Sequence, residues 1–420
     1  MPDHPIASWS EALQSAPGPL TLEWALILAI AALTGHLVQR YTGLPKLIGY
    51  AVVGALTGTA GFAAAAWPLH GVGLYLLELG IAVMLFEAGA RLSLRWFRHN
   101  PMVLVQSVVE SSLTFAAAFV ALRALGVDLP VARALSMVAV AASPAVLMRV
   151  VSDLRASGPV TDRAVALATL NTLYALTLGT AMLRTVGRGD TGLLASLAST
   201  AAVLGISLLV GALLAALLAG AFRLLHPTSQ DTAIVVLALI GACAAVTTSL
   251  GGSAPLATLL AGIVLKQFHP RPWVWPRQLG TASSMLTILM FVLVSSMAAQ
   301  ANWGGAITWA ALALIGTRLA SKVVSLLITG PASSLSLRQS LWVGVAMFPM
   351  SAVALLLTSQ FVVASPTVGA QVAAIALPVI LLTELLGAVL VGGALVHVRE
   401  AERPSRRHGE PPPDDGGATP

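Results

Sequence analysis

The sequence predicts an all-α polytopic membrane protein with about thirteen transmembrane helices, built as an inverted repeat with two interrupted, crossing helices. The first supporting observation is composition: 57% of the 420 residues are apolar and 10% are charged, against about 25% charged in an ordinary soluble domain. Because hydrocarbon tolerates few charges, this composition excludes a soluble enzyme, a coiled coil and a disordered chain. The other two observations are the spacing of the apolar runs and a pair of matched prolines.

Thirteen apolar runs, separated by Pro, Gly or basic residues, are candidate spans. A helix needs about 20 residues to cross the hydrocarbon core, so the second and ninth runs are short. The runs fall near 22–40, 46–61, 69–90, 101–122, 131–150, 162–184, 192–221, 232–250, 254–268, 279–299, 305–328, 338–360 and 368–397.

The basic residues predict the orientation of these spans. One set of loops, with the C-terminal tail, carries seventeen of the 23 Lys and Arg residues; the other set carries four, and two lie inside the run at 305–328. The richer side faces the cytoplasm, which places the N-terminus outside and the C-terminus inside a cell (inner) membrane. This bias accounts for the net charge of +6, so no nucleic-acid partner is expected.

The two ends of the chain are expected to lie outside the packed helices. Residues 1–21 contain Asp3 and Glu11 but no Lys or Arg, so the basic region of a cleavable signal is missing and the run at 22–40 is a retained span. Residues 399–420 are rich in Pro, Gly and charge, which predicts a disordered cytoplasmic tail after a membrane domain over 1–398.

No cofactor, metal site or enzymatic motif is predicted. The single cysteine, Cys243, lies in an apolar run, and the eight histidines are scattered at span ends and in the tails, without metal-ligand spacing. The glycine-containing stretch at 249–253 lacks the following Lys and Ser or Thr of a phosphate-binding loop.

Two proline-containing segments suggest an internal repeat. Residues 138–148 (VAVAASPAVLM) and 343–353 (VGVAMFPMSAV) align on Pro144 and Pro349. They lie seven spans apart, so they cross the membrane in opposite directions, as in an inverted repeat. A proline within a span removes a backbone donor, and two at equivalent places point to a transporter site. One kinked helix alone would need no function. We therefore expect helix breaks at Ser143, Pro144, Pro349 and Ser351.

Six motifs in the right order resemble the monovalent cation:proton antiporter superfamily, especially its Kef-like second branch of sodium/hydrogen exchangers. The resemblance runs from about 44 to 387, and each motif is weak alone. The motifs are GLPKLIGYAVVGALTG (43–58), LELGIAVMLFEAGARLSL (77–94), SPAVLMRVVSD (143–153), SAPLATLLAGIVL (253–265), SLRQSLWVGVAMFPMSAVALLL (336–357) and TELLG (383–387).

The resemblance implies the sodium/proton antiporter fold, with ions bound beside the crossed half-helices. It implies scaffold helices at about 22–90 and 232–299 that form a homodimer. A core at about 101–184 and 305–397 would move like an elevator, and a linker helix would lie at about 192–221.

The chain departs from the family where relatives carry acids. Asn171 and Thr172 stand where relatives have a pair ending in an acid, and Ala352 stands where Kef-like relatives have Glu. Lys322 keeps the family spacing, 16 residues before Arg338. Asn171 and Thr172 could coordinate a dehydrated cation, but neither titrates near neutral pH. Asn171 could instead only bridge helices.

The proton would then reside on Lys322, Glu110 or Glu384, with Lys322 the first choice. Lys322 could alternatively neutralise the C-terminal ends of the broken helices or pair with a carboxylate. Arg318 lies four residues earlier on the same helix face, so acidic partners or an anionic ligand are expected. Either Glu110 or Glu384 could face these cations, as proton carrier or as counter-ion.

Three functions remain open at this point. The first is exchange of sodium or potassium for protons by alternating access. The second is an anion-coupled or uncoupled carrier on the same fold, suggested by two retained cations and two missing acids. The third is a homologue without transport activity that acts as a regulatory or assembly subunit.

Overall fold

The computed structural model describes residues 22–60, 71–188, 193–225, 229–268, 277–301, 303–350 and 352–401, and every regular element in these ranges is helical. The α-helices are α2 (Leu22–Thr42), α3 (Lys46–Thr59), α4 (Gly71–Arg91), α5 (Leu94–His99), α6 (Met102–Ala124), α7 (Leu129–Val140), α8 (Pro144–Asp153), α9 (Pro159–Arg188), α10 (Leu193–Leu224), α11 (Gln230–Ser249), α12 (Ala254–Phe268), α13 (Arg277–Ala299), α14 (Gly305–Thr329), α15 (Leu337–Ala346), α16 (Ala352–Ala364) and α17 (Pro366–His397), with a 3₁₀ turn, η1, at Pro331–Ser333.

Each of the thirteen predicted runs corresponds to helix, and two of them are split. The run at 131–150 forms α7 and α8, and the run at 338–360 forms α15 and α16. The short helix α5 and the turn η1 are additions that the hydropathy pattern did not predict. Seven of the described segments are long and apolar enough to cross a membrane, and three apolar helices of 10–17 residues accompany them.

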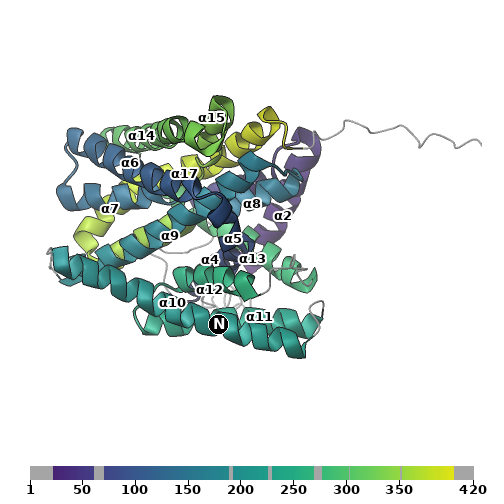
Figure 1. Cartoon of the computed structure of the whole chain (residues 1–420). Helices are drawn as coiled ribbons and strands as arrows, with labels where there is room; N and C mark the ends of the chain where they lie inside the picture. Colours follow the sequence, from purple (N-terminus) through teal and green to yellow (C-terminus); the bar gives the residue numbers. More distant parts are fainter. Residues whose placement is uncertain are drawn as a thin grey trace, which may run out of the picture.

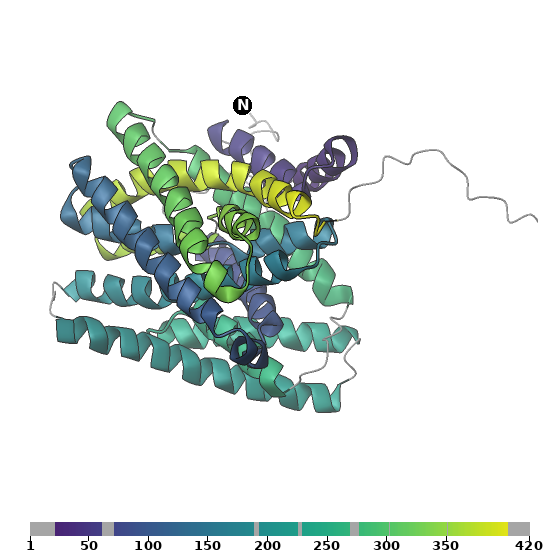
Figure 2. The same cartoon turned by 45° about the horizontal axis from the view of Figure 1, so that its top comes forward.

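Helix pairs that are distant in sequence make up the body of the molecule. α3 packs on α13, α4 on α12, and α6 on α14. α6 and α14 lie on the opposite side of the molecule from α10 and α11 (Figures 1 and 2). Glycines allow helices to pair closely: a Cβ at Gly89 would lie 2.2 Å from the Leu259 carbonyl oxygen, and one at Gly262 would lie 2.2 Å from that of Phe86. α4 and α12 are therefore in backbone contact.

The first break lies between α7 and α8. α7 ends at Val140, and Pro144 begins α8, where its missing N–H is not needed. The Ser143 hydroxyl caps α8 by accepting from the Val146 amide at 3.2 Å. The proline therefore starts a new helix instead of kinking a continuous one.

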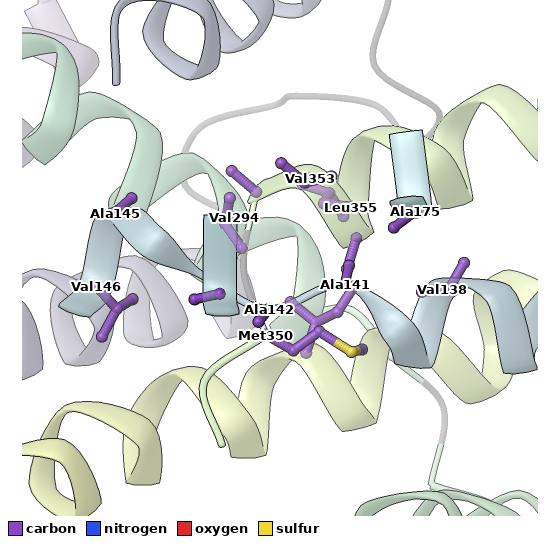
Figure 3. Packing of buried hydrophobic residues seen from close by; sticks show 14 of the residues in the cluster. Val138, Ala141, Ala142, Ala145, Val146, Ala175, Val294, Met350, Val353 and Leu355 are labelled. Carbon is purple, nitrogen blue, oxygen red and sulfur yellow. The ribbon is translucent and has the colours of Figure 1, made fainter. Parts of the chain in front are cut away.

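The second break lies between α15, which ends at Ala346, and α16, which begins at Ala352. Pro349 lies within this gap, and Ser351 is outside the described residues. The two breaks meet: the Ser143 amide donates to the Pro349 carbonyl at 3.1 Å. Figure 3 shows Ala142 of the first break beside Met350 of the second. The predicted crossing of two interrupted helices is thus confirmed.

The residues that directly follow α17 are attached to the start of α9. The Glu400 carboxylate accepts from the Val160 and Thr161 amides at 2.9 and 2.7 Å and from the Thr161 hydroxyl at 2.8 Å. A carboxylate suits the positive N-terminal end of a helix. Residues 399–401, which the sequence assigned to the tail, are therefore held against α9.

Candidate ion-binding site

Arg318 of α14 binds the C-terminal ends of α7 and α15, the first half of each interrupted helix. Its side chain is fully buried, and its Nε donates to the Ala139 carbonyl at 2.9 Å. Nη2 donates to Ala141 at 2.6 Å and to Pro349 at 3.2 Å, and Nη1 donates to Phe348. One guanidinium thus compensates carbonyls that have lost their helical partners on both sides of the crossing.

The sequence left open which cation lies at these helix ends. The role of neutralising both helix ends was considered for Lys322, but the structure gives it to Arg318, one turn earlier. Arginine suits the role because its planar group presents five donors in a fixed fork, whereas the lysine ammonium presents three from one atom.

Lys322 instead forms a buried ion pair with Glu110 of α6. Its Nζ lies 2.6 Å from Glu110 Oε1, and both side chains are inaccessible to solvent. The same oxygen accepts from the Thr114 hydroxyl at 2.9 Å. The ion pair joins α6 to α14, so Lys322 has a carboxylate partner, which was one of the possibilities considered above.

Asn171 of α9 completes this cluster. Its Nδ2 donates to Glu110 Oε2, while its Oδ1 accepts from the Ser111 hydroxyl at 3.0 Å. The serine contact fixes the orientation of the amide, so that the nitrogen faces the carboxylate. Asn171 therefore bridges two helices and also contacts the buried acid. We refer to Glu110, Lys322 and Asn171 as the acid cluster.

Thr172, the next residue on α9, contacts the first break. Its hydroxyl lies 2.9 Å from the Ala142 carbonyl and 2.8 Å from that of Ala168. Ala352, at the other position where relatives carry an acid, is a buried apolar residue at the start of α16. Neither residue can hold a proton near neutral pH.

Glu384 of α17 stands apart from both cations. Its side chain is 3% exposed, and neither carboxyl oxygen has a hydrogen-bond partner among the described residues. The adjacent Thr383 hydroxyl approaches the Met350 carbonyl of the second break at 3.3 Å while donating to Val379 at 2.7 Å. Of the two carboxylates expected to face Lys322 or Arg318, only Glu110 has an ion pair with either of them in the part of the chain that the structure describes.

The polar neighbours of the acid cluster were not predicted from the sequence. They are Ser111 and Thr114 on α6 and Ser321 on α14, whose hydroxyl lies 3.0 Å from that of Thr114. One signal was present, because Thr114 follows Glu110 by four residues and so shares its helix face. Away from this cluster, Glu87 and Arg91 form an i,i+4 ion pair at the end of α4, at 2.8 Å. No group of three His, Cys, Asp or Glu side chains in the described ranges is placed to hold a metal ion.

Comparisons with known proteins agree with this geometry. The family model "Sodium/hydrogen exchanger, transmembrane" matches residues 25–396. The structure is similar to that of the sodium proton antiporter MjNhaP1 from Methanocaldococcus jannaschii at pH 8, with a TM-score of 0.66 and 15% identity over 89% of this chain and 96% of that one. A second structure of the same antiporter gives a TM-score of 0.67 and 16% identity over 92% and 100%. No curated protein matches in a sequence search.

The family match covers most of the chain, and the structural likeness covers nearly all of the antiporter with which it is compared. Both findings confirm the all-helical antiporter fold that the motifs implied, and the family consists of transporters and not of enzymes. The chain therefore belongs to the sodium/hydrogen exchanger family of multi-pass membrane proteins.

Proposed function

We propose that this protein exchanges a monovalent cation, sodium or potassium, for protons by alternating access, with Glu110 and Lys322 as the coupling pair. The observation that carries the proposal is the fully buried ion pair at 2.6 Å, one helical turn from the arginine that holds the crossing. Family membership supports cation and proton exchange in general. The pair supplies the titratable group that Thr172 and Ala352 do not.

The chemistry is a competition for one carboxylate. In the structure Glu110 is balanced by the Lys322 ammonium, and Asn171 and Thr114 complete its hydrogen bonds. A dehydrated cation that binds Glu110 replaces the ammonium, which then loses its proton to water. The net charge of the site stays at zero, because one positive charge enters and one proton leaves. The carboxylate therefore holds the cation or the protonated lysine in turn, and this alternation couples the two flows.

The neutral groups around Glu110 would complete the coordination shell. The Asn171 and Ser111 oxygens and the Thr114 hydroxyl are the nearest of these, all of them buried. Oxygen ligands suit alkali cations, and the choice between sodium and potassium depends on how closely these groups can approach. Because Asn171 faces Glu110 with its nitrogen, a bound cation would require the amide to turn over.

Exchange by everted membrane vesicles tests the proposal. An acid-inside pH gradient is established, and its dissipation is followed by a fluorescent dye after addition of sodium, potassium or an impermeant cation. Each addition is made as the chloride and as the gluconate salt. We expect dissipation with sodium or potassium, whichever anion is present, and its loss in Glu110→Gln and Lys322→Gln.

Glu87→Gln is the matched control, since it removes a carboxylate from an exposed ion pair on α4 and should leave exchange unchanged. Dissipation that follows chloride and ignores the cation would support the anion-coupled alternative. A folded wild-type protein that dissipates no gradient would support a regulatory or assembly role.

The partners of Arg318 and Lys322 weaken the argument for the anion-coupled alternative. It was considered because two cations face the same side of α14. Arg318 has four carbonyl partners, and Lys322 has a carboxylate. Neither cation therefore needs an anionic ligand to compensate its charge in this conformation.

We also propose the larger arrangement implied by the family. The acid cluster lies in the helices assigned to a mobile core, and the helices at 22–90 and 232–299 form a scaffold through which two copies associate. The N-terminus lies outside and the C-terminus in the cytoplasm of a cell (inner) membrane. Labelling of single cysteines introduced in 1–15 and 405–420 tests the orientation, and mass photometry in lipid nanodiscs tests the dimer.

A further inference from the structure

The carboxyl group of Glu384 has no place in the exchange described above, and its surroundings suggest a role of its own. We propose that Glu384 is a second proton-binding residue, separate from the acid cluster, which is protonated in the conformation described here and releases its proton when the second break opens to water. The proposal rests on burial, on the absence of partners among the described residues, and on position beside the break.

Burial decides the protonation state. Glu384 is 3% exposed, and neither of its oxygens accepts or donates a hydrogen bond within the described part of the chain. An ionised carboxylate in such a place would lack both water and a counter-charge, and its transfer from water is far more costly than that of the neutral acid. The neutral carboxylic acid is therefore the form that fits this conformation.

The charged and titratable side chains of neighbouring helices do not alter this conclusion. α17 packs against α3, α7, α8, α13, α14, α15 and α16. On α14, Arg318 binds carbonyls and Lys322 binds Glu110. Arg149 of α8 is paired with Asp153, and Arg338 of α15 donates to the His397 carbonyl. None of the other described titratable side chains on these helices, Lys46 and Tyr50 on α3 and Arg133 on α7, forms a hydrogen bond or ion pair with Glu384.

The position of Glu384 connects it to the second break. Thr383 approaches the Met350 carbonyl, and a Cβ at Gly387, one turn further along α17, would lie 2.9 Å from Pro349. Glu384 lies between these two residues along α17. A change in the geometry of the break would therefore act on the turn of α17 that carries this carboxyl group.

An acid without a partner among the described residues contributes little to stability, which argues for a functional role. A neutral residue of similar shape would avoid the loss of hydrogen bonds, and ionisable residues inside membrane spans mark transport pathways by default. In this proposal water stabilises the ionised form, and it reaches the group in a different conformation. Release of the proton leaves a carboxylate: Glu384–COOH gives Glu384–COO⁻ and H⁺.

The consequence for transport, which rests on the proposed function, concerns stoichiometry. Exchange at Glu110 and Lys322 alone moves one proton against one monovalent cation and transfers no net charge. A second proton carried by Glu384 makes the cycle two protons against one cation, and such a cycle moves one net charge. The membrane potential then drives the wild-type protein.

Infrared spectroscopy of the purified protein in lipid tests the protonation state without any need for transport. Protein grown with isotopically labelled glutamate should show, at neutral pH, a carbonyl band of a protonated carboxylic acid that shifts with the label. We expect Glu384→Gln to lose this band and the matched Glu87→Gln to keep it. Glu384→Asp should restore a band that shifts only with labelled aspartate, which preserves the test if the glutamine variant folds poorly.

The absence of such a band in the wild type, or its persistence in Glu384→Gln, would overturn the proposal.

A second experiment measures transport in proteoliposomes with an imposed membrane potential. We expect exchange by the wild type to respond to the potential and exchange by Glu384→Gln to continue without responding. Equal responses of the two proteins would also refute a proton carried by Glu384. A wild type that shows the band but no exchange would refute only the proposed function.

Discussion

The two helix breaks share one support and differ in the group that lies beside them. Arg318 binds carbonyls of both breaks. A threonine hydroxyl also lies near one carbonyl of each break: Thr172 of α9 at the first and Thr383 of α17 at the second. Beside the first lies the acid cluster, in which every charged group has a partner. Beside the second lies Glu384, which has none among the described residues.

This difference separates what maintains the fold from what binds ions. The shared features supply donors to free carbonyls, which any interrupted helix needs inside a membrane. The features that differ are acids, and acids are the groups that distinguish a proton from a metal cation. The two repeats thus satisfy their free backbone carbonyls in the same way but carry different titratable groups.

The largest effect is expected from Arg318→Met, which removes the support that both breaks share. Four carbonyls would lose their donor, so we expect the free energy of unfolding to fall by at least about 3 kcal/mol. Thermal unfolding followed by tryptophan fluorescence measures the change. Arg318→Lys should recover only part of it, and Arg91→Met, at an exposed ion pair, should cost no more than about 1 kcal/mol. An unchanged melting temperature would show that the guanidinium does not support the breaks.

The second prediction concerns the Glu110–Lys322 ion pair, which lies beside the first break only. Glu110→Gln and Lys322→Gln should each destabilise by about 3 kcal/mol, because each leaves a buried charge unpaired. The double variant should cost clearly less than the sum, since neither charge then remains. Denaturant unfolding of the four proteins gives the coupling energy. Additive losses would mean that the two side chains do not interact as the structure indicates.

The third prediction compares the two threonines. Thr172→Val and Thr383→Val each remove one hydroxyl from a break carbonyl, so each should destabilise by about 1 kcal/mol. Only Thr172 adjoins the acid cluster, so only its replacement should weaken cation binding, by roughly three- to tenfold. The cation concentration that gives half-maximal exchange is the measurement. Equal shifts in both variants would remove the functional difference between the two breaks.

The smallest effect is expected at the helices that follow the breaks. The Glu400 carboxylate accepts hydrogen bonds from the first amides of α9, whereas α17 begins at Pro366 without a side-chain cap. Glu400→Gln should weaken the first turn of α9 by about 0.5–1 kcal/mol. Hydrogen exchange followed by mass spectrometry should then be faster over 159–165 and unchanged over 366–372. Glu87→Gln should change neither segment, and faster exchange in both would point to a general loss of stability.

The sequence allowed the fold to be predicted well because membrane constraints are simple. Long apolar runs located the thirteen segments, and the matched prolines located both breaks. Pro144 occupies the first position of α8, where the rules for helix N-termini place it. The short helix α5 was missed because six residues near the end of a span carry no hydropathy signal of their own.

The candidate site was predicted less completely, because a pairing across helices depends on rotation and depth. From the sequence, Glu110 and Glu384 were equivalent candidates for facing the two cations. Lys322 was also a candidate for binding the helix ends, which Arg318 binds in the structure. One helical turn separates these two cations, and helix boundaries inferred from hydropathy are uncertain by a similar amount. Motif spacing identified the helix that carries the cations but did not assign their partners.

The binding of Arg318 to both breaks also has a consequence for biosynthesis. The Ala141 carbonyl lies 177 residues before the guanidinium that binds it. At a synthesis rate of about 5–20 residues per second, the first break waits roughly 10–35 s for its donor. During that interval the first half of the chain is already in the membrane with free carbonyls, so water or the insertion machinery must satisfy them. Slowing translation between the two halves should therefore lower the yield of folded protein more than an equal delay after residue 318.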